Sequence, residues 1–341
     1  MPTFSISIFN IYSSPMLIYA GIDEAGYGPM LGPLCVGCSV FAIEDHDPAQ
    51  GKVDLWKHLS RAVCRKKSDR KHRIAIDDSK RLKGASKGKA HPLKHLERGV
   101  LAFLAASKND PHDLPDTDVD LFDQFDMRLQ DAPWYDSVTQ LPVANDLDQL
   151  RIATSRLCRT MTEQQVQCSL MGVEVVDAGP FNRQVELMGN KASVNFGAVM
   201  RHVDRIWNRW PTEHPRVIVD RQGGRTHYRE PLQMAFPEAH IRIVAEEEAI
   251  SRYRLDQGGS KLTISFLKEA EVHHLPVALA SMIAKYIREL AMIRMNRHFQ
   301  AQMPELKPTA GYVQDARRYL VEIEPIIRSC EIDRRDLVRN C

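Results

Sequence analysis

Residues 17–29 read Leu-Ile-Tyr-Ala-Gly-Ile-Asp-Glu-Ala-Gly-Tyr-Gly-Pro, an apolar run that ends in two adjacent acids and a glycine-rich turn. An otherwise apolar strand has no packing reason to end in Asp23 and Glu24, because charges there cost free energy unless a positive group compensates them. A hard metal ion held by oxygen ligands is the simplest compensation. The stretch therefore predicts a buried strand with a candidate cation site at its carboxyl end.

The composition of the chain is that of an ordinary globular protein. Its 341 residues are 43% hydrophobic and 26% charged, and the formal net charge of +2 does not by itself indicate a nucleic-acid partner. The basic run at 61–73 is either a solvated face or a phosphate contact. No apolar stretch approaches the roughly 18 residues of a membrane span, and the seven cysteines are irregularly spaced. We expect a soluble, cytoplasmic monomer with reduced thiols and no membrane contact.

The order of the predicted elements is typical of a mixed α/β sheet covered by helices. We expect a disordered leader over 1–15, a main domain over 16–320 with a helical or irregular insertion at about 108–165, and a helical C-terminal extension over 321–341. The hydrophobic pattern predicts strands at 16–23, 33–43, 172–177, 217–220, 241–244 and 260–267, and helices at 93–107, 148–168, 192–210, 228–235, 276–300 and within 313–340.

A second acid ends another predicted strand. In open α/β sheets, sites gather at the strand ends where the loops diverge. Asp220 follows Val-Ile-Val, so it would meet Asp23 and Glu24 if the two strands are neighbours. The alternative interpretation is that Asp220 caps the next helix.

The long predicted helix offers a further acid, Glu289. It shares one side of the helix with Ser281, Lys285 and Arg288, opposite an apolar stripe. One interpretation is a solvated face with a Lys285–Glu289 pair worth about 0.3–0.5 kcal/mol. The other is that this side overhangs the strand ends, so that Glu289 reaches a metal and Lys285 or Arg288 meets phosphate.

Electrostatics limits what a cluster of carboxylates could be. Two carboxylates about 4 Å apart repel by about 4 kcal/mol at an effective dielectric constant of 20, so several together take up protons unless cations are bound. Mg²⁺ or Mn²⁺ would resolve the conflict and would favour phosphate oxygens as further ligands. A pair of such ions stabilises the attacking and leaving oxygens of an in-line displacement. The chemistry that fits is phosphodiester hydrolysis.

Five segments, in family order, resemble the type 2 ribonucleases H (ribonuclease HII). One such segment alone would be weak, whereas five in order make a specific match that frames about residues 16–320. The segments are Asp23–Pro29 with Gly32 and Pro33 following, Asp78–Leu82, Val217–Asp220, Ala280–Glu289 and Gly311–Val313.

The resemblance implies a ribonuclease H-like fold, with a mixed five-stranded sheet flanked by helices. It implies a metal-dependent endonuclease that uses Mg²⁺ or Mn²⁺, and no nucleotide cofactor, to hydrolyse the RNA strand of RNA/DNA hybrids or ribonucleotides embedded in DNA. Such an enzyme must read the 2′-hydroxyl. The catalytic residues and metal ligands implied are Asp23, Glu24, Asp220 and Glu289, and the substrate-binding residues are Gly26, Tyr27, Gly28, Ser79, Lys80, Ser281, Lys285, Arg288 and Tyr312.

The sequence departs from the family pattern at three places. Tyr27 stands where the family has Arg or Lys, Glu289 stands where it usually has Asp, and Asp220 is followed by Arg-Gln rather than by Gly. These departures motivate the alternative of a catalytically weak or inactive ribonuclease H-like nucleic-acid-binding protein. A dinucleotide-binding enzyme is disfavoured, because Gly32 comes one residue too late for GxGxxG and Pro29 interrupts the turn.

Overall fold

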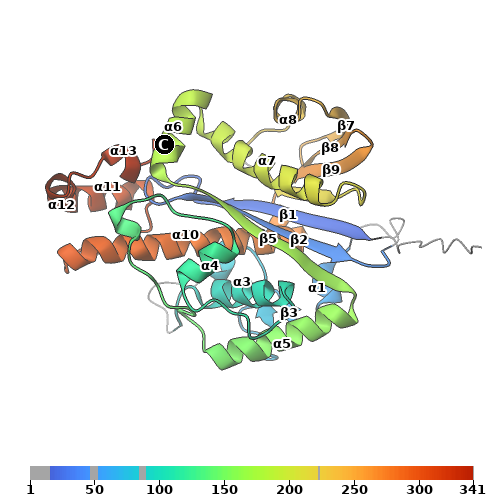
Figure 1. Ribbon diagram of the computed structural model, residues 1–341, viewed down its shortest axis with the longest axis horizontal. Coiled ribbons are helices and arrows are strands. Elements are labelled where there is room, and N and C mark those ends of the chain that lie inside the picture. Colours follow the sequence, from blue (N-terminus) through green and yellow to red (C-terminus); the bar gives the residue numbers. More distant parts are fainter. Residues whose placement is uncertain (1–15, 47–52, 84–89, 222, 341) are drawn as a thin grey trace, which may run out of the picture.

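The computed structural model describes residues 16–46, 53–83, 90–221 and 223–340 (Figure 1), so the leader predicted over 1–15 lies outside the described residues. Its centre is a seven-stranded sheet in the order β5-β2-β1-β6-β9-β8-β7. The strands are β1 (Leu17–Ala25), β2 (Leu34–Ile43), β5 (Val166–Val176), β6 (Arg216–Asp220), β7 (His240–Glu246), β8 (Ile250–Gln257) and β9 (Ser260–Leu267).

The predicted mixed α/β sheet is confirmed, because β1 pairs antiparallel with β2 and parallel with β6, and β6 pairs parallel with β9. The predicted number of five strands is wrong, since β8 and β7 extend the edge beyond β9. The prediction missed β8, although buried Tyr253 and Leu255 alternate there with polar residues. It also extended a helix to residue 168, whereas the helix ends at Glu163 and Gln165 turns the chain with φ of 51°.

Helices cover both faces of the sheet. In Figure 1, α7 lies over one face, and α10 and α3 lie over the other. The helices are α1 (Leu55–His58), α2 (Ser79–Leu82), α3 (Lys94–Ser107), α4 (Asp118–Gln124), α5 (Leu147–Glu163), α6 (Ala178–Met188), α7 (Lys191–Arg209), α8 (Arg229–Ala235), α9 (Ala270–His273), α10 (Leu275–Gln302), α11 (Val313–Glu322), α12 (Glu324–Ser329) and α13 (Arg334–Leu337), with a 3₁₀ turn η2 (Pro133–Tyr135) and a small pair β3 (Val63–Cys64) and β4 (Ile74–Ala75).

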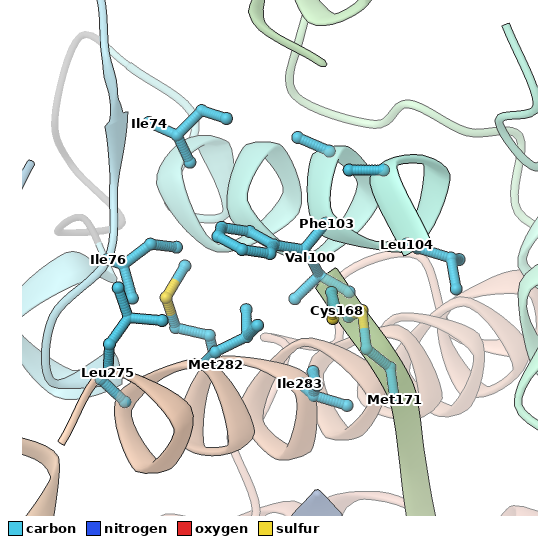
Figure 2. Close-up of a cluster of buried hydrophobic side chains, with 14 of the residues drawn as sticks. Ile74, Ile76, Val100, Phe103, Leu104, Cys168, Met171, Leu275, Met282 and Ile283 are labelled. Carbon is cyan, nitrogen blue, oxygen red and sulfur yellow. The ribbon is translucent and has the colours of Figure 1, made fainter. Parts of the chain in front are cut away.

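The long helix α10 is buried nearly all round rather than along one stripe. Figure 2 shows its Met282 and Ile283 packed among the side chains of α3 and β5. On its other side, α10 crosses glycines of the sheet, because a Cβ on Gly21 would lie 2.1 Å from the Val277 nitrogen and one on Gly37 would lie 2.1 Å from the Ala280 oxygen. This close approach holds α10 directly against the end of β1.

The segment 108–165, predicted as an insertion, contains α4, η2 and α5. A buried ion pair between Arg294 of α10 and Asp118 of α4 joins it to the core. Its last helix, α5, packs against α3. Over the described ranges, no helix combines the length and the apolar character that a bilayer crossing requires.

The C-terminal segment closes onto the turn after β1. The Gly311 carbonyl accepts hydrogen bonds from the nitrogens of Met30 (2.8 Å) and Leu31 (3.2 Å). Arg339 donates to the Gly26 carbonyl at 2.5 Å and also to that of Pro29. Residues more than 280 positions apart therefore build one surface next to the end of β1.

Candidate active site

Two acids predicted from separate strands lie side by side. The parallel pairing of β1 and β6 ends with Ile22 opposite Val219, so the next residues, Asp23 and Asp220, lie at the same level of the two strands. Neighbouring strands are about 4.8 Å apart. Side chains at every second position of a strand lie on the same face, so Asp23 shares a face with Tyr19, and Asp220 shares one with Ile218. Tyr19 and Ile218 pack in the core under α10, so both acids lie on the α10 face of the sheet.

Asp23 is buried, with 8% of its surface exposed. Burial raises its pKa well above the ordinary value, and the nearby carboxylates of Glu24 and Asp220 raise it further. A hydrogen bond from Ser281 and one from the Glu24 backbone nitrogen (2.7 Å) act in the opposite direction. The hydroxyls of Ser281 and Ser79 are also hydrogen-bonded, at 2.9 Å. The α10 and α2 segments found in the sequence thus meet at the Asp23 carboxyl.

Asp220 is less deeply buried but strongly perturbed. Its pKa is raised to about 7, chiefly by burial and also by the carboxylates of Glu271 and Glu24, while a hydrogen bond from the Ala270 nitrogen (2.8 Å) lowers it. The predicted alternative, that Asp220 caps the helix after β6, does not fit, because its side chain accepts from the start of α9 instead. Burial and mutual repulsion therefore disfavour the state in which both Asp23 and Asp220 are ionised.

Glu271 is an acid of this cluster that the sequence reasoning missed. It lies on α9, the short helix after β9, and its carboxyl is hydrogen-bonded to that of Asp220. Its Oε2 atom is buried and has no hydrogen-bond partner among the described residues. The signal was available, since the strand predicted at 260–267 is followed closely by Glu269 and Glu271. A third parallel strand ending beside β6 would have indicated them.

The structure engages the Glu289 carboxylate with two lysines, so its role as a fourth ligand stays a prediction. The Glu289 Oε1 atom pairs with Lys83 Nζ at 2.8 Å and with Lys285 Nζ at 3.0 Å. Burial acts to raise the Glu289 pKa, but the two ammonium groups outweigh it and the pKa is lowered. Glu289 lies eight residues beyond Ser281, about 12 Å along the helix axis. The Lys285–Glu289 pair within α10 is the alternative interpretation of this helix face given by the sequence.

The donor atoms at the strand ends suit a hard divalent cation. Asp23, Glu24, Asp220 and Glu271 offer only carboxylate oxygens, which Mg²⁺ and Mn²⁺ prefer. Added positive charge would give the unpaired Oε2 of Glu271 a partner, and it would offset the repulsion that raises the pKa values of Asp23 and Asp220. Within the part of the chain that the structure describes, no three His, Cys, Asp or Glu side chains converge closely enough to hold an ion as they stand.

The turn predicted to bind substrate adjoins the acids. Gly26 has φ of 86°, a conformation that favours glycine. Tyr27 is half-buried, and the Lys191 ammonium lies 5.0 Å from its ring centre. Burial and the Glu24 carboxylate raise the Tyr27 pKa. A cavity of about 230 Å³ extends from Tyr27 and Gly223 to Asp220. Gly28 is exposed beside it.

Five of the other predicted substrate residues can be placed as follows. Ser281 and Ser79 are buried, with Ser281 hydrogen-bonded to Asp23 and Ser79 hydrogen-bonded to Ser281. Lys80 is exposed at the start of α2, and Lys285 is largely buried in its pair with Glu289. Tyr312 follows Gly311 with 53% of its surface exposed.

Arg288 does not lie where it could meet a phosphate, so that prediction is corrected. It is fully buried, and its Nη2 atom donates to the carbonyls of Leu31 and Ala310, both at 3.0 Å. A Cβ on Gly26 would lie 2.6 Å from Arg288 Nε. Arg288 therefore fastens the turn after β1 to the segment before Tyr312.

No family model and no curated protein sequence matches the chain. Among solved structures, the chain is similar to ribonuclease HII of Archaeoglobus fulgidus in its complex with PCNA (16% identity, TM-score 0.44, covering 95% of this chain and 94% of the other). It is similar to Bst-RNase HIII in complex with Mn²⁺ (14%, 0.40, 96% and 67%) and to ribonuclease H2 of Pyrococcus horikoshii (14%, 0.35, 94% and 92%). These similarities are distant, and the function proposed below rests on the residues of the site.

Proposed function

We propose that this protein is a divalent-cation-dependent endonuclease that hydrolyses the RNA strand of RNA/DNA hybrids or ribonucleotides embedded in DNA. One observation carries the proposal. Asp23 and Asp220, which have raised pKa values, follow the last paired residues of two adjacent parallel strands, and the buried Oε2 of Glu271 beside them lacks a partner among the described residues. Burying such a group of acids costs folding free energy, and bound cations would compensate their charges.

Each group of site residues has its own role in the proposed reaction. Asp23, Glu24, Asp220 and Glu271 would hold Mg²⁺ or Mn²⁺, with Glu271 in the place first assigned to Glu289. When bound, the cations supply the positive charge that stabilises the attacking and leaving oxygens of in-line phosphodiester hydrolysis. Ser281 holds the Asp23 carboxyl in place through its hydrogen bond.

Recognition of RNA is assigned to the surface that the C-terminal segment builds with the turn after β1. The backbone of Gly26, Tyr27 and Gly28 would face the ribose, where the 2′-hydroxyl separates RNA from DNA. The exposed ring of Tyr312 would pack on the neighbouring sugar. Exposed Lys80 would meet a phosphate, and Lys285 would add positive charge behind it. Because the Tyr27 ring cannot form the paired hydrogen bonds of a guanidinium, selectivity for a single embedded ribonucleotide is expected to be modest.

The test is cleavage of end-labelled substrates by the full chain with Mg²⁺ or Mn²⁺. Three substrates separate the possibilities: a hybrid with a continuous RNA strand, a DNA duplex with one ribonucleotide, and an all-DNA duplex. We expect products from the first two only, and none with EDTA or with the Asp23→Asn variant. If the wild-type chain cuts no faster than Asp23→Asn on every ribonucleotide-containing substrate, the proposal is wrong.

A second candidate function is nucleic-acid binding without catalysis. It is favoured by Tyr27 in place of a basic residue and by the lack, among the described residues, of three side chains already positioned around a metal. In that case affinity for hybrids would be the same with EDTA and with Mn²⁺, and no cleavage would accompany it. If EDTA abolishes cleavage while the protein still binds the hybrid, the endonuclease is the correct assignment.

A further inference from the structure

A row of arginines crosses the sheet away from the acids. Strand pairing places Arg216 of β6 opposite Thr263 of β9, Thr263 opposite Arg254 of β8, and Arg254 opposite Arg242 of β7. Residues directly opposite one another share a face of the sheet. The row therefore spans four strands, about 14 Å at a spacing of about 4.8 Å per strand.

The row lies on the face of the sheet that includes Asp220. Arg216, Ile218 and Asp220 alternate to one side of β6, whereas Val217 and Val219 pack in the core under α7. Asp220 is four positions after Arg216, which is about 13 Å along the strand. Arg252 fills part of the interval, because it is opposite Ser265 and donates to the Ser265 hydroxyl at 3.0 Å.

The positive charge of this face is not compensated within the fold. Arg216, Arg242, Arg252 and Arg254 form no ion pair with any described residue. Like charges directly opposite each other across antiparallel strands are destabilising, and Arg242 and Arg254 are such a pair.

Acids near the arginines do not pair with them. Glu246 at the end of β7 is engaged by Tyr253 and His227, and Glu247 and Glu248 lie in the turn to β8. Asp54 acts on Tyr19 next to Arg216, and Asp256 lies one row further along β8, opposite Lys261. Neither pairs with an arginine of the row. The face therefore keeps a positive excess.

The face is also hollowed and open. Arg216, Arg252, Arg254, Thr263 and Ser265 line a cavity of about 400 Å³. Arg242 and Arg254 are exposed, and α9 and α10 contact β6 on this face. The other residues that line the cavity are mostly apolar, so the part of it that can receive phosphate oxygens is the guanidinium and hydroxyl groups of its three arginines, Thr263 and Ser265.

We propose that the sheet face carrying Arg216, Arg242, Arg252 and Arg254 binds the phosphodiester backbone of the nucleic acid that reaches the acids at the end of β6. Charge complementarity selects this occupant, because a chain of phosphates supplies regularly spaced anions that one small ligand would not. The inference rests on the proposed function for the identity of the polymer, and it assigns to that polymer a second contact surface outside the strand ends.

The test compares two pairs of exposed arginines that change the net charge equally. Arg242→Gln/Arg254→Gln alters the row, and Arg128→Gln/Arg159→Gln alters exposed arginines elsewhere. Fluorescence anisotropy in EDTA measures the affinity of each full-length variant for a labelled hybrid duplex of about 20 base pairs over a series of salt concentrations. We expect the first variant to bind about tenfold more weakly and its slope of log K against log salt to fall by about 1.8, the value for two lost phosphate contacts.

A third variant, Arg242→Lys/Arg254→Lys, keeps the charge and should keep most of the slope. Equal slopes for the first variant and its control, in proteins with unchanged circular dichroism, would overturn the inference. Because EDTA prevents metal-dependent cleavage, the result is separate from the proposed activity. A chain that binds through these arginines but cuts nothing refutes the nuclease, whereas a chain that cuts but keeps an unchanged slope refutes this surface.

Discussion

The carboxyl of Glu271 contacts that of Asp220, and the Oε2 atom of Glu271 is buried with no partner among the described residues. We predict that Glu271→Gln lowers the rate of hybrid cleavage by at least about 100-fold, equivalent to about 3 kcal/mol of transition-state stabilisation. The amide removes one anionic oxygen from the cation site while keeping the shape of the side chain. Initial rates with saturating Mn²⁺ measure the effect.

The matched control for that prediction is Glu289→Gln, the same change on α10. Its carboxylate is engaged by Lys83 and Lys285. We expect a loss of less than about tenfold, from the altered lysines alone. A larger effect of Glu289→Gln than of Glu271→Gln would reverse the assignment and restore the ligand set predicted from the sequence.

The acid cluster should also be visible as metal-dependent stability. A cation that binds only the folded chain raises the free energy of unfolding by about 2.7 kcal/mol at 100 times its Kd. We expect Mn²⁺ to raise the Tm of the wild-type protein and to leave that of Asp23→Asn/Asp220→Asn unchanged. Thermal melts with and without EDTA measure this. An equal Mn²⁺ shift in both proteins would mean that the ion binds elsewhere.

The same melts give a second expectation for the metal-free state. Asp23 is a buried acid surrounded by Glu24 and Asp220, and its raised pKa reports that its ionised form is disfavoured there. Near pH 8 in EDTA, Asp23→Asn should therefore melt at a higher temperature than the wild-type protein, because it removes a buried charge. A lower Tm would show that the charge is already compensated in the folded chain.

The sequence was informative where the physics is local. Two acids at the end of an apolar strand indicate a site without any tertiary information, and the apolar run before Asp220 indicates a second strand of the same kind. Glu271 could not be placed in this way, because its role depends on β9 lying parallel to β6, which is a matter of strand order. Its neighbourhood reads as a polar loop until that order is known.

For helix α10, the sequence pattern leads to a wrong expectation about the polar side of the helix. Periodicity separates an apolar stripe from a polar side and predicts that the polar side is solvated or faces a ligand. The helix is in fact enclosed on both sides, so its polar residues serve buried contacts: Ser281 holds Asp23, and Arg288 fastens two loops. Periodicity cannot distinguish a solvated polar side from one that is buried among polar partners.

The close packing of α10 on β1 gives a prediction about stability. A Cβ on Gly21 would lie 2.1 Å from the Val277 nitrogen, which is backbone and cannot move aside cheaply. We expect Gly21→Ala to lower the free energy of unfolding by about 3 kcal/mol or more. The control is Gly197→Ala in α7, where the nearest atom is 3.9 Å away. That change should stabilise the helix by about 0.5–1 kcal/mol. Urea unfolding measures both, and similar values would contradict the packing described.

Buried His202 should make stability depend on pH. Its Nε2 atom lies 2.9 Å from the Val36 carbonyl, and burial lowers its pKa to about 4, against about 6.5 in an unfolded chain. Between these values the unfolded chain binds a proton that the folded chain does not, so this stability is complete above pH 6.5 and is lost as the pH falls. At pH 5 the loss is about 2 kcal/mol. His202→Gln keeps a donor for Val36 but does not titrate, so its stability should fall less between pH 7 and pH 5. The exposed His240→Gln serves as control, and parallel profiles for all three proteins would show that His202 is protonated in the folded state.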